Sequence, residues 1–401
     1  MHHKKKENMK QPVRKRIVEA NNIDQTKYRY ILVCDMNNIM KISSVDHRMN
    51  NKGNEYGIVL TSLRMVGEIL KKKDFDFCYA AYDGEGSGVL RWQMYPDYKS
   101  NRGKNYELYS NENEYYKKLN DYARKVINYS REKRKEKDNL IESDEESFER
   151  QKGILQEILD ELCIRQFMFD KVEGDDVVSY IVKNKEPRDK IVIVSSDKDL
   201  TQLISDTVII YNPRTKDFIT KDNSVEKIGI THENVVLQKM LCGDASDNIK
   251  GIKGIGETTL AKLFPSITTR KMHLNEVLEH SKQLLEERKA EKKKPLKSLE
   301  NIINSVTDGC QGDKIYEINR KIIDLSKPLL TEEAEKTLKE EIGSVLDTDD
   351  RDVKNVYRII SDNGMDDITD ERRFGDLLAP YSRIIMMEKR RYGSYKNGQN
   401  D

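Results

Sequence analysis

The hydrophobic positions of this 401-residue chain form four short apolar runs in its first 211 residues. The runs are rich in β-branched and aromatic residues and do not alternate strictly with polar ones, which is typical of strands buried on both faces of a parallel sheet. We therefore predict four buried strands: Tyr30–Cys34, Phe77–Tyr82, Lys190–Val194 and Thr207–Tyr211.

Segments with helical spacing of apolar residues lie between and after these runs, notably Val59–Leu70, Phe148–Leu162 and Val177–Val182. Strands that alternate with helices predict an α/β domain with a mainly parallel central sheet. From about Thr231 onward the pattern is helical with short connections and predicts no further strand.

Three other segments are defined by their composition. Residues 1 to about 27 are polar and basic and predict a flexible arm, more typical of a solvated tail than of a nucleic-acid contact. Residues 286–297 are dense in Lys and Glu with one proline, which favours an exposed loop or helix end over a site. Residues 331–401 predict a helical extension that either supports the preceding helical region or docks a partner protein.

Net charge does not indicate a partner, because 71 Lys and Arg nearly balance 70 Asp and Glu. No run approaches the roughly 20 apolar residues that a membrane span needs, and the N-terminus lacks the apolar run of a signal peptide. The cysteines show no CxxC spacing and suit free thiols in a reducing cytoplasm. They are Cys34, Cys78, Cys163, Cys242 and Cys310.

Acidic residues follow three of the four predicted strands. Asp35 and Asp83 each come directly after a strand, and Asp197 and Asp199 follow a third. Because ligands gather outside the carboxyl ends of parallel strands, we expect these carboxylates to lie close together. Two further acidic clusters, which we assign to helical segments, contain Glu173, Asp175 and Asp176, and Asp244 and Asp247.

Taken singly, each of these acids could be an ordinary helix cap. Taken together, they would repel one another and resist ionisation unless cations neutralise them. Carboxylates suit Mg²⁺ or Mn²⁺, and no cluster of His or Cys offers a zinc site. Two such ions about 4 Å apart can activate a water and stabilise a leaving phosphate oxygen. The acids therefore indicate a metal-dependent nuclease.

The order of the acidic blocks resembles that of the flap endonuclease, or 5′-nuclease, family, and is most similar to its bacteriophage ribonuclease H type. The blocks are Asp35–Asn38, Tyr82–Gly84, Val172–Asp176, Ser196–Leu200 and Gly243–Asn248. The resemblance covers Tyr28 to Leu330. It implies a PIN-like nuclease domain at 28–230 with a helical arch at about 103–147, and a helix-hairpin-helix domain at 231–330.

The resemblance also implies roles for individual residues. It assigns the metal nearer the chemistry to Asp35, Asp83, Glu173, Asp175 and Asp197, and the second metal to Asp176, Asp199, Asp244 and Asp247. It places Lys99, Arg102 and Arg91 near the scissile phosphate, where cations would stabilise developing charge. Without the acids, the segment around Lys99 and Arg102 would be interpreted as an exposed polar turn.

The segment between Arg102 and Lys137 is basic and carries interleaved tyrosines. Phosphates pair with cations and bases stack on rings, so this composition suits a single strand. The segment matches the family's helical arch in position, and a solvated helix is the alternative. The predicted strand contacts are Tyr98, Lys117, Lys118, Arg124 and Lys125.

A second predicted binding element is the segment Gly251–Phe264, which resembles a helix-hairpin-helix. Gly254 and Gly256 would let the backbone approach a phosphate. With Lys253 and Lys262 the element would grip duplex backbone without reading its sequence. The resemblance implies a K⁺ ion held by backbone carbonyls of this loop.

The sequence thus supports a structure-specific 5′-3′ exonuclease or flap endonuclease that uses two Mg²⁺ ions, or Mn²⁺ in their place. The resemblance implies ribonuclease H activity on RNA primers in DNA replication. The expected substrates are DNA with a 5′ flap, a nick or an RNA primer. The expected protein is a monomer, from a bacterium or a phage, that works with a separate polymerase, single-strand-binding protein or clamp. The alternatives are a PIN-type ribonuclease and a non-catalytic junction-binding relative.

Overall fold

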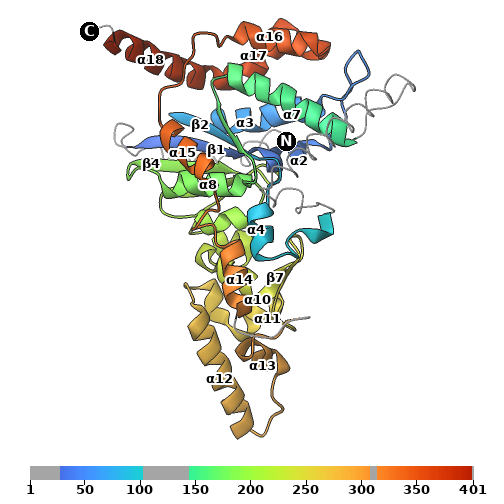
Figure 1. Cartoon of the computed structure of the whole chain (residues 1–401), viewed down its shortest axis with the longest axis vertical. Helices are drawn as coiled ribbons and strands as arrows, with labels where there is room; N and C mark the ends of the chain where they lie inside the picture. The colour runs from blue at the N-terminus through green and yellow to red at the C-terminus, as the bar shows by residue number, and fades with distance from the viewer. Residues whose placement is uncertain (1–27, 103–143, 308–313, 400–401) are drawn as a thin grey trace, which may run out of the picture.

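The computed structural model describes residues 28–102, 144–307 and 314–399. The strands of its central sheet are β1 (Arg29–Asp35), β2 (Phe77–Asp83), β3 (Arg165–Phe169), β4 (Asp189–Val194), β5 (Val208–Asn212) and β6 (Asp217–Ile219). They lie in the order β3-β2-β1-β4-β5-β6, and only β6 pairs antiparallel with its neighbour. The mainly parallel α/β sheet is therefore confirmed (Figure 1).

The four predicted strands are confirmed, and β3 and β6 were missed. Both are edge strands. In β3, Met168 is 47% exposed, so the strand lacks the continuous apolar run that marks a fully buried strand. Strand β6 has only three residues, too few for any periodicity to register.

Helices cover both faces of the sheet, as expected for a parallel sheet. One face packs against α2 (Met36–Ser43), α3 (Gly57–Leu70) and α7 (Asp144–Glu161), and the other against α8 (Gly174–Lys183). Alternate residues of β1 divide between the two cores: Leu32 faces α3 and α7, whereas Ile31 and Val33 face α8. Short α4 (Val89–Met94) follows β2 and leads to η1 (Ser100–Arg102), while η2 (Asp199–Leu203) follows β4.

A second group of helices extends away from the sheet around a separate apolar core (Figure 1). It contains α9 (Ser224–Ile228), α10 (Val235–Cys242), α11 (Glu257–Leu263), α12 (Leu274–Ala290), α13 (Lys297–Ile303) and α14 (Lys314–Ile323). Two-residue strands β7 (Gly243–Asp244) and β8 (Ile249–Lys250) form an antiparallel hairpin within it. The prediction of no strand after Thr231 was therefore wrong, because a two-residue strand leaves no apolar pattern.

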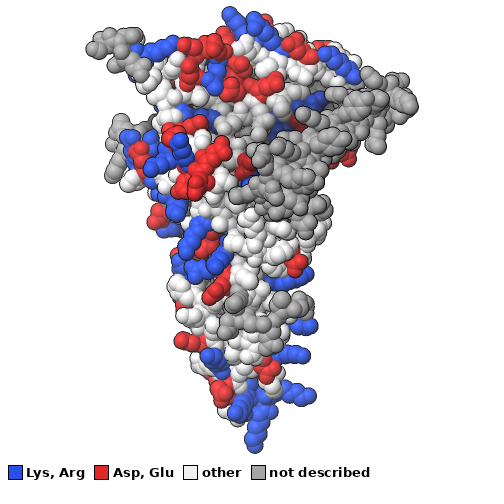
Figure 2. All heavy atoms as spheres, viewed as in Figure 1, with Lys and Arg blue, Asp and Glu red and all other residues white. Residues whose placement is uncertain are grey.

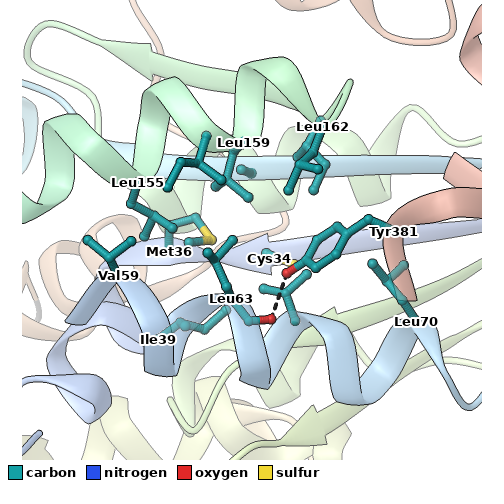
Figure 3. Close-up of a cluster of buried hydrophobic side chains, with 14 of the residues drawn as sticks. Cys34, Met36, Ile39, Val59, Leu63, Leu70, Leu155, Leu159, Leu162 and Tyr381 are labelled. Atoms are coloured by element: carbon teal, nitrogen blue, oxygen red, sulfur yellow. Dashed lines mark hydrogen bonds between the residues drawn. The ribbon is translucent and has the colours of Figure 1, made fainter. Parts of the chain in front are cut away.

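The remaining helices are α15 (Glu332–Glu341), α16 (Val353–Asp362), α17 (Glu371–Leu378) and α18 (Ser382–Gln399). Ala334 and Leu338 of α15 join the core on the α8 face, whereas α16–α18 cover α3 and α7. Tyr381 illustrates this cover, since its hydroxyl donates to the Leu63 carbonyl at 2.6 Å (Figure 3). Residues 331–399 thus pack on the sheet domain and not on the described core of helices α9–α14, and docking of a partner protein stays a prediction.

Two expectations concern the chain's environment. The described cysteines are free thiols, three of them buried and Cys242 half-buried; Cys310 lies outside the described residues. In the described part of the chain, no helix combines the length and apolarity that a bilayer span requires.

Candidate metal centre and its basic rim

Asp35 and Asp83 are the last residues of neighbouring strands β1 and β2, and Asp197 follows β4 on the other side of β1. Parallel strands end at one edge, so the fold brings these three acids together. Asp35 is buried and held twice: one carboxylate oxygen accepts from Ser195 Oγ at 2.8 Å, and the other caps α2 by accepting from Asn38 N at 3.1 Å.

Two asparagines at the start of α2 tie the three strand ends together. Asn37 Oδ1 accepts from the backbone N of Asp83 at 3.3 Å. Asn38 Oδ1 accepts from both the backbone N and Oγ of Ser196 at 2.9 Å. The first acidic block of the sequence contains both asparagines, but we assigned them no role; their position two and three residues after a strand-end aspartate was the available signal.

The first turn of α8 brings further acids to the same edge. The backbone N of Gly174 donates to Asp83 Oδ1 at 2.8 Å. A β-carbon at Gly174 would lie only 3.3 Å from the Tyr82 carbonyl carbon, so glycine permits this close approach. Asp175, the next residue, is then carried in among the strand-end carboxylates.

Two of these carboxylates, Asp35 and Asp175, resist ionisation. Burial raises the pKa of Asp35 to about 7, with repulsion from Asp197 and Asp83 adding to it. Burial and the charges of Asp197, Asp35 and Asp83 raise the pKa of Asp175 well above its usual range. Oxygen donors that repel one another in a buried site fit a hard divalent cation, which would relieve that repulsion.

A second acidic group contains Asp199, Asp244 and Asp247, each of which offers a carboxylate oxygen within 4.8 Å of the others. Asp244 lies in β7 and Asp247 in the turn of the β7–β8 hairpin, so our helical assignment of Gly243–Asn248 was wrong. The hairpin is tight: Gly243 has φ +73°, and its β-carbon would lie 2.4 Å from the backbone N of Gly251. A cavity of about 420 Å³ opens beside Asp199 and Asp244.

Lys239 of α10 neutralises part of this second group. Its ammonium contacts Asp199, and lies 2.5 Å from Asp244 Oδ2. Burial raises the pKa of Asp199 to about 6 although Lys239 opposes the shift; at Asp244, Lys239 and Ser246 outweigh burial and lower the pKa to about 2. Sequence reasoning missed Lys239, whose only signal was a cation in the last turn of an otherwise apolar helix.

Lys99 and Arg102 form a basic rim on the acid cluster. The backbone of Lys99 has φ +52° and its N donates to the Asp247 carbonyl at 2.9 Å. Its ammonium pairs with Glu173, while Arg102 Nη2 lies 2.6 Å from Asp247 Oδ1. Burial alone would raise the pKa of Glu173, but Arg91 and Lys99 outweigh it and lower that pKa to about 2.

Arg91 and Asp176 occupy positions that differ from those predicted. Arg91 is 5% exposed and hydrogen-bonds Asp176 through both terminal nitrogens, so neither residue is available to a phosphate or a second metal ion. Tyr98 is 3% exposed, and its hydroxyl donates to Glu173 at 3.1 Å. Its ring therefore cannot stack on a base, because it packs with the residues under the cluster.

The predicted hairpin element is exposed where it was expected to meet DNA. Lys253, Gly254, Gly256 and Lys262 are exposed, whereas Ile252, Ile255 and Leu260 are buried in the lower core. The predicted arch contacts Lys117, Lys118, Arg124 and Lys125 lie outside the described residues, as does the basic arm of residues 1–27.

Comparisons with known proteins agree on one family. Residues 39–229 match the model of the 5′-3′ exonuclease N-terminal resolvase-like domain. A 5′-3′ exonuclease of Aquifex aeolicus is 25% identical over 213 residues, covering 53% of this chain and 69% of that protein. DNA polymerase I of Bacillus subtilis is 33% identical over 163 residues, covering 39% and 18%. This chain thus spans less than a fifth of that polymerase.

Among solved structures, a bacteriophage T5 flap endonuclease in complex with DNA and metal ions aligns with a TM-score of 0.51. It is 18% identical, and the alignment covers 88% of this chain and 100% of the T5 chain. At that identity the likeness shows a shared fold.

Proposed function

The chain belongs to the 5′-3′ exonuclease, or 5′-nuclease, family, and on that premise we propose that it is a structure-specific nuclease that hydrolyses phosphodiester bonds near 5′ ends in DNA. The observation that supports this most strongly is the convergence of carboxylates from β1, β2, β4, α8 and the β7–β8 hairpin on one edge of the sheet. Lys99 and Arg102 border these acids, so a bound phosphate would meet cations on the same side.

The acids divide into two ligand sets. Asp35, Asp83, Glu173, Asp175 and Asp197 would hold one Mg²⁺ ion, and Asp199, Asp244 and Asp247 would hold the second. Mn²⁺ would serve in place of Mg²⁺, because both ions prefer oxygen ligands. When bound, the ions supply Lewis-acid stabilisation of charge on the phosphoryl oxygens.

The chain's own residues orient the phosphate. Glu173 pairs with the Lys99 ammonium, and the charges of Glu173 and Asp247 raise the pKa of Lys99 despite burial, which keeps it charged. Arg102, whose side chain is 41% exposed, can exchange Asp247 for a substrate phosphate at little cost. Both cations would offset negative charge that develops during displacement.

Duplex recognition falls to the loop around Gly254 and Gly256, with Lys253 and Lys262 contacting phosphates and a K⁺ ion held by loop carbonyls. The basic segment between Arg102 and Lys137, within the predicted arch of residues 103–147, would clamp the 5′ strand. The substrates we propose are DNA flaps, nicks and RNA primers, cleaved by a monomer in the cytoplasm of a bacterium or an infected host. A separate polymerase, single-strand-binding protein or clamp would act beside it.

A cleavage assay on a 5′-flapped duplex with Mg²⁺ tests this function. Asp83→Asn and Asp197→Asn should keep DNA binding and lose at least about 10²-fold in turnover, the scale of losing one strong charge-stabilising group. Asp222→Asn removes an exposed aspartate elsewhere and should cleave normally. Binding without cleavage by the wild-type protein would indicate a non-catalytic relative. Preference for single-stranded RNA over the flap and the RNA–DNA hybrid would indicate a PIN-type ribonuclease.

A further inference from the structure

The turn between α12 and α13 carries a dense positive charge, which we call the basic tip and define as residues 288–297. Six cations and one acid give the tip a formal charge of +5: Arg288, Lys289, Glu291, Lys292, Lys293, Lys294 and Lys297. The tip lies at the end of the α9–α14 helical group that is farthest from the sheet (Figure 1). Figure 2 shows Lys and Arg side chains projecting there.

The backbone of the basic tip is held in one conformation. Lys292 adopts φ +55°, which lets Lys293 N donate back to the Arg288 carbonyl at 2.8 Å and close the end of α12. Arg288 Nε then donates to the Lys294 carbonyl at 2.9 Å. These bonds use backbone groups and one guanidinium, and they leave the lysine side chains pointing outward.

Most of the lysine charge in the tip is not neutralised by the protein. Lys293 pairs with Glu291 at 2.7 Å. Lys289, Lys292, Lys294 and Lys297 are exposed and form no ion pair with any residue that the structure describes. Some exposed lysines elsewhere, such as Lys216 and Lys227, have carboxylate partners, and others have none among the described residues; the tip differs in holding four such unpaired lysines within one turn. Four unneutralised ammonium groups on one turn favour a polyanionic partner.

The basic tip is physically continuous with the hairpin loop that is proposed to grip duplex DNA. Asn301 of α13 donates to the Lys253 carbonyl at 2.8 Å, and Lys253 N donates to the Val306 carbonyl at 2.9 Å. A β-carbon at Gly254 would meet Ser298, one residue after Lys297, at 3.9 Å. The start of α13, where the basic tip ends, therefore packs directly against the loop.

We propose that the basic tip is a second phosphate-binding site that extends the duplex footprint beyond the hairpin loop. The inference rests on the proposed nuclease function. It assigns the tip to duplex DNA backbone, contacted by the ammonium groups without base recognition. Helix α12 is about 25 Å long at 1.5 Å per residue and runs outward from the sheet domain. A duplex bound at the hairpin loop would therefore have to be long enough to reach the tip.

The test compares two triple variants of the full chain in an Asp83→Asn background, which binds without cutting. One is Lys292→Gln, Lys294→Gln, Lys297→Gln. The matched control is Lys336→Gln, Lys339→Gln, Lys354→Gln, which removes the same charge from exposed positions on α15 and α16. Affinity is measured against salt on plain duplexes of about 10 to 30 base pairs, roughly one to three helical turns.

Each lost phosphate contact should lower the slope of log K against log salt by about 0.9, so the tip variant should lose up to about 2.7. The loss should be largest on the long duplexes and smallest on the shortest, because Lys297 lies beside the loop, while the control should follow the parent throughout. A tip variant with the parent's slope on every duplex would overturn the inference. Weaker binding of poly-glutamate with unchanged duplex binding would also overturn it, and would assign the tip to an acidic protein.

Failure of the proposed function gives a different result. If the chain does not cut a 5′ flap but the tip variant still loses affinity mainly for long duplexes, then the basic tip binds DNA and the nuclease assignment fails. If the chain cuts the flap and the tip variant binds normally, the assignment stands and the inference fails. Melting temperatures of both triple variants should match that of the parent, because the substituted side chains are exposed.

Discussion

Arg91 hydrogen-bonds Asp176 through both terminal nitrogens of its guanidinium, one at 2.5 Å and the other at 2.9 Å from a carboxylate oxygen. The same two residues bond to the end of α14 and to the segment after it, since Arg91 Nε donates to the Ile322 carbonyl and Asp176 accepts from Leu329 N, both at 2.9 Å. This buried pair therefore joins α4 and α8 to a distant segment beneath the acid cluster.

Arg91→Met should destabilise the protein by about 3–5 kcal/mol, because it leaves the buried carboxylates of Asp176 and Glu173 without their main counter-charge. Urea denaturation monitored by circular dichroism measures the change. Arg102→Met is the control: its half-exposed ion pair should contribute at most about 1 kcal/mol, while cleavage falls. If the Arg91→Met protein were stable but inactive, that result would support the predicted contact between Arg91 and the substrate phosphate.

Divalent ions should raise the melting temperature, because they bind the folded acid cluster and not the unfolded chain. Asp35→Asn should reduce that increment. In EDTA the variant should be at least as stable as wild type, since it removes one of several repelling carboxylates and asparagine can still accept a cap hydrogen bond. Differential scanning fluorimetry with a Mg²⁺ titration makes the comparison, with Asp222→Asn as control. An unchanged increment in Asp35→Asn would remove Asp35 from the ligand set.

Lys239→Met should lower the melting temperature in EDTA, because Asp199 and Asp244 lose their shared cation. Saturating Mg²⁺ should reduce the difference in melting temperature between Lys239→Met and wild type, since a divalent ion supplies the missing positive charge. The matched variant Lys198→Met changes an exposed lysine of the neighbouring loop and should show no such dependence. A deficit that is the same with and without Mg²⁺ would argue against a metal ion beside Lys239.

Tyr381→Phe should lower the free energy of unfolding by about 1 kcal/mol, the net value of its hydrogen bond to the Leu63 carbonyl. Tyr381→Ala should lower it by about 3–5 kcal/mol, because it leaves a cavity between α3 and the C-terminal helices. Tyr395→Ala, which changes a ring that is 48% exposed on α18, should cost far less. Urea denaturation distinguishes the three. Equal stability of Tyr381→Ala and wild type would mean that these helices do not stabilise the sheet domain.

The sequence was sufficient for the parallel sheet and for the acids at its carboxyl edge, because buried runs and strand-end aspartates are local signals. It was insufficient where a side chain's neighbours come from remote segments. Arg91 and Lys99 both follow Asp83 closely in the sequence, yet only Lys99 lies in the basic rim of the acid cluster. Arg91, on α4, instead pairs with Asp176 of α8. Lys239 was missed because its contact with Asp199 joins α10 to the remote η2, although its other partner, Asp244, lies only five positions after it.

The sheet domain is completed by residues made long after its strands. Tyr381 bonds to a carbonyl 318 positions earlier, and Arg391 donates to the Asp76 carbonyl 315 positions earlier. Translation at about 5–20 residues per second delivers Arg391 on the order of ten seconds after Asp247, the last predicted metal ligand. During that interval a nascent chain would hold every candidate ligand while the apolar face of α3 and α7 that the C-terminal helices cover stays exposed to solvent.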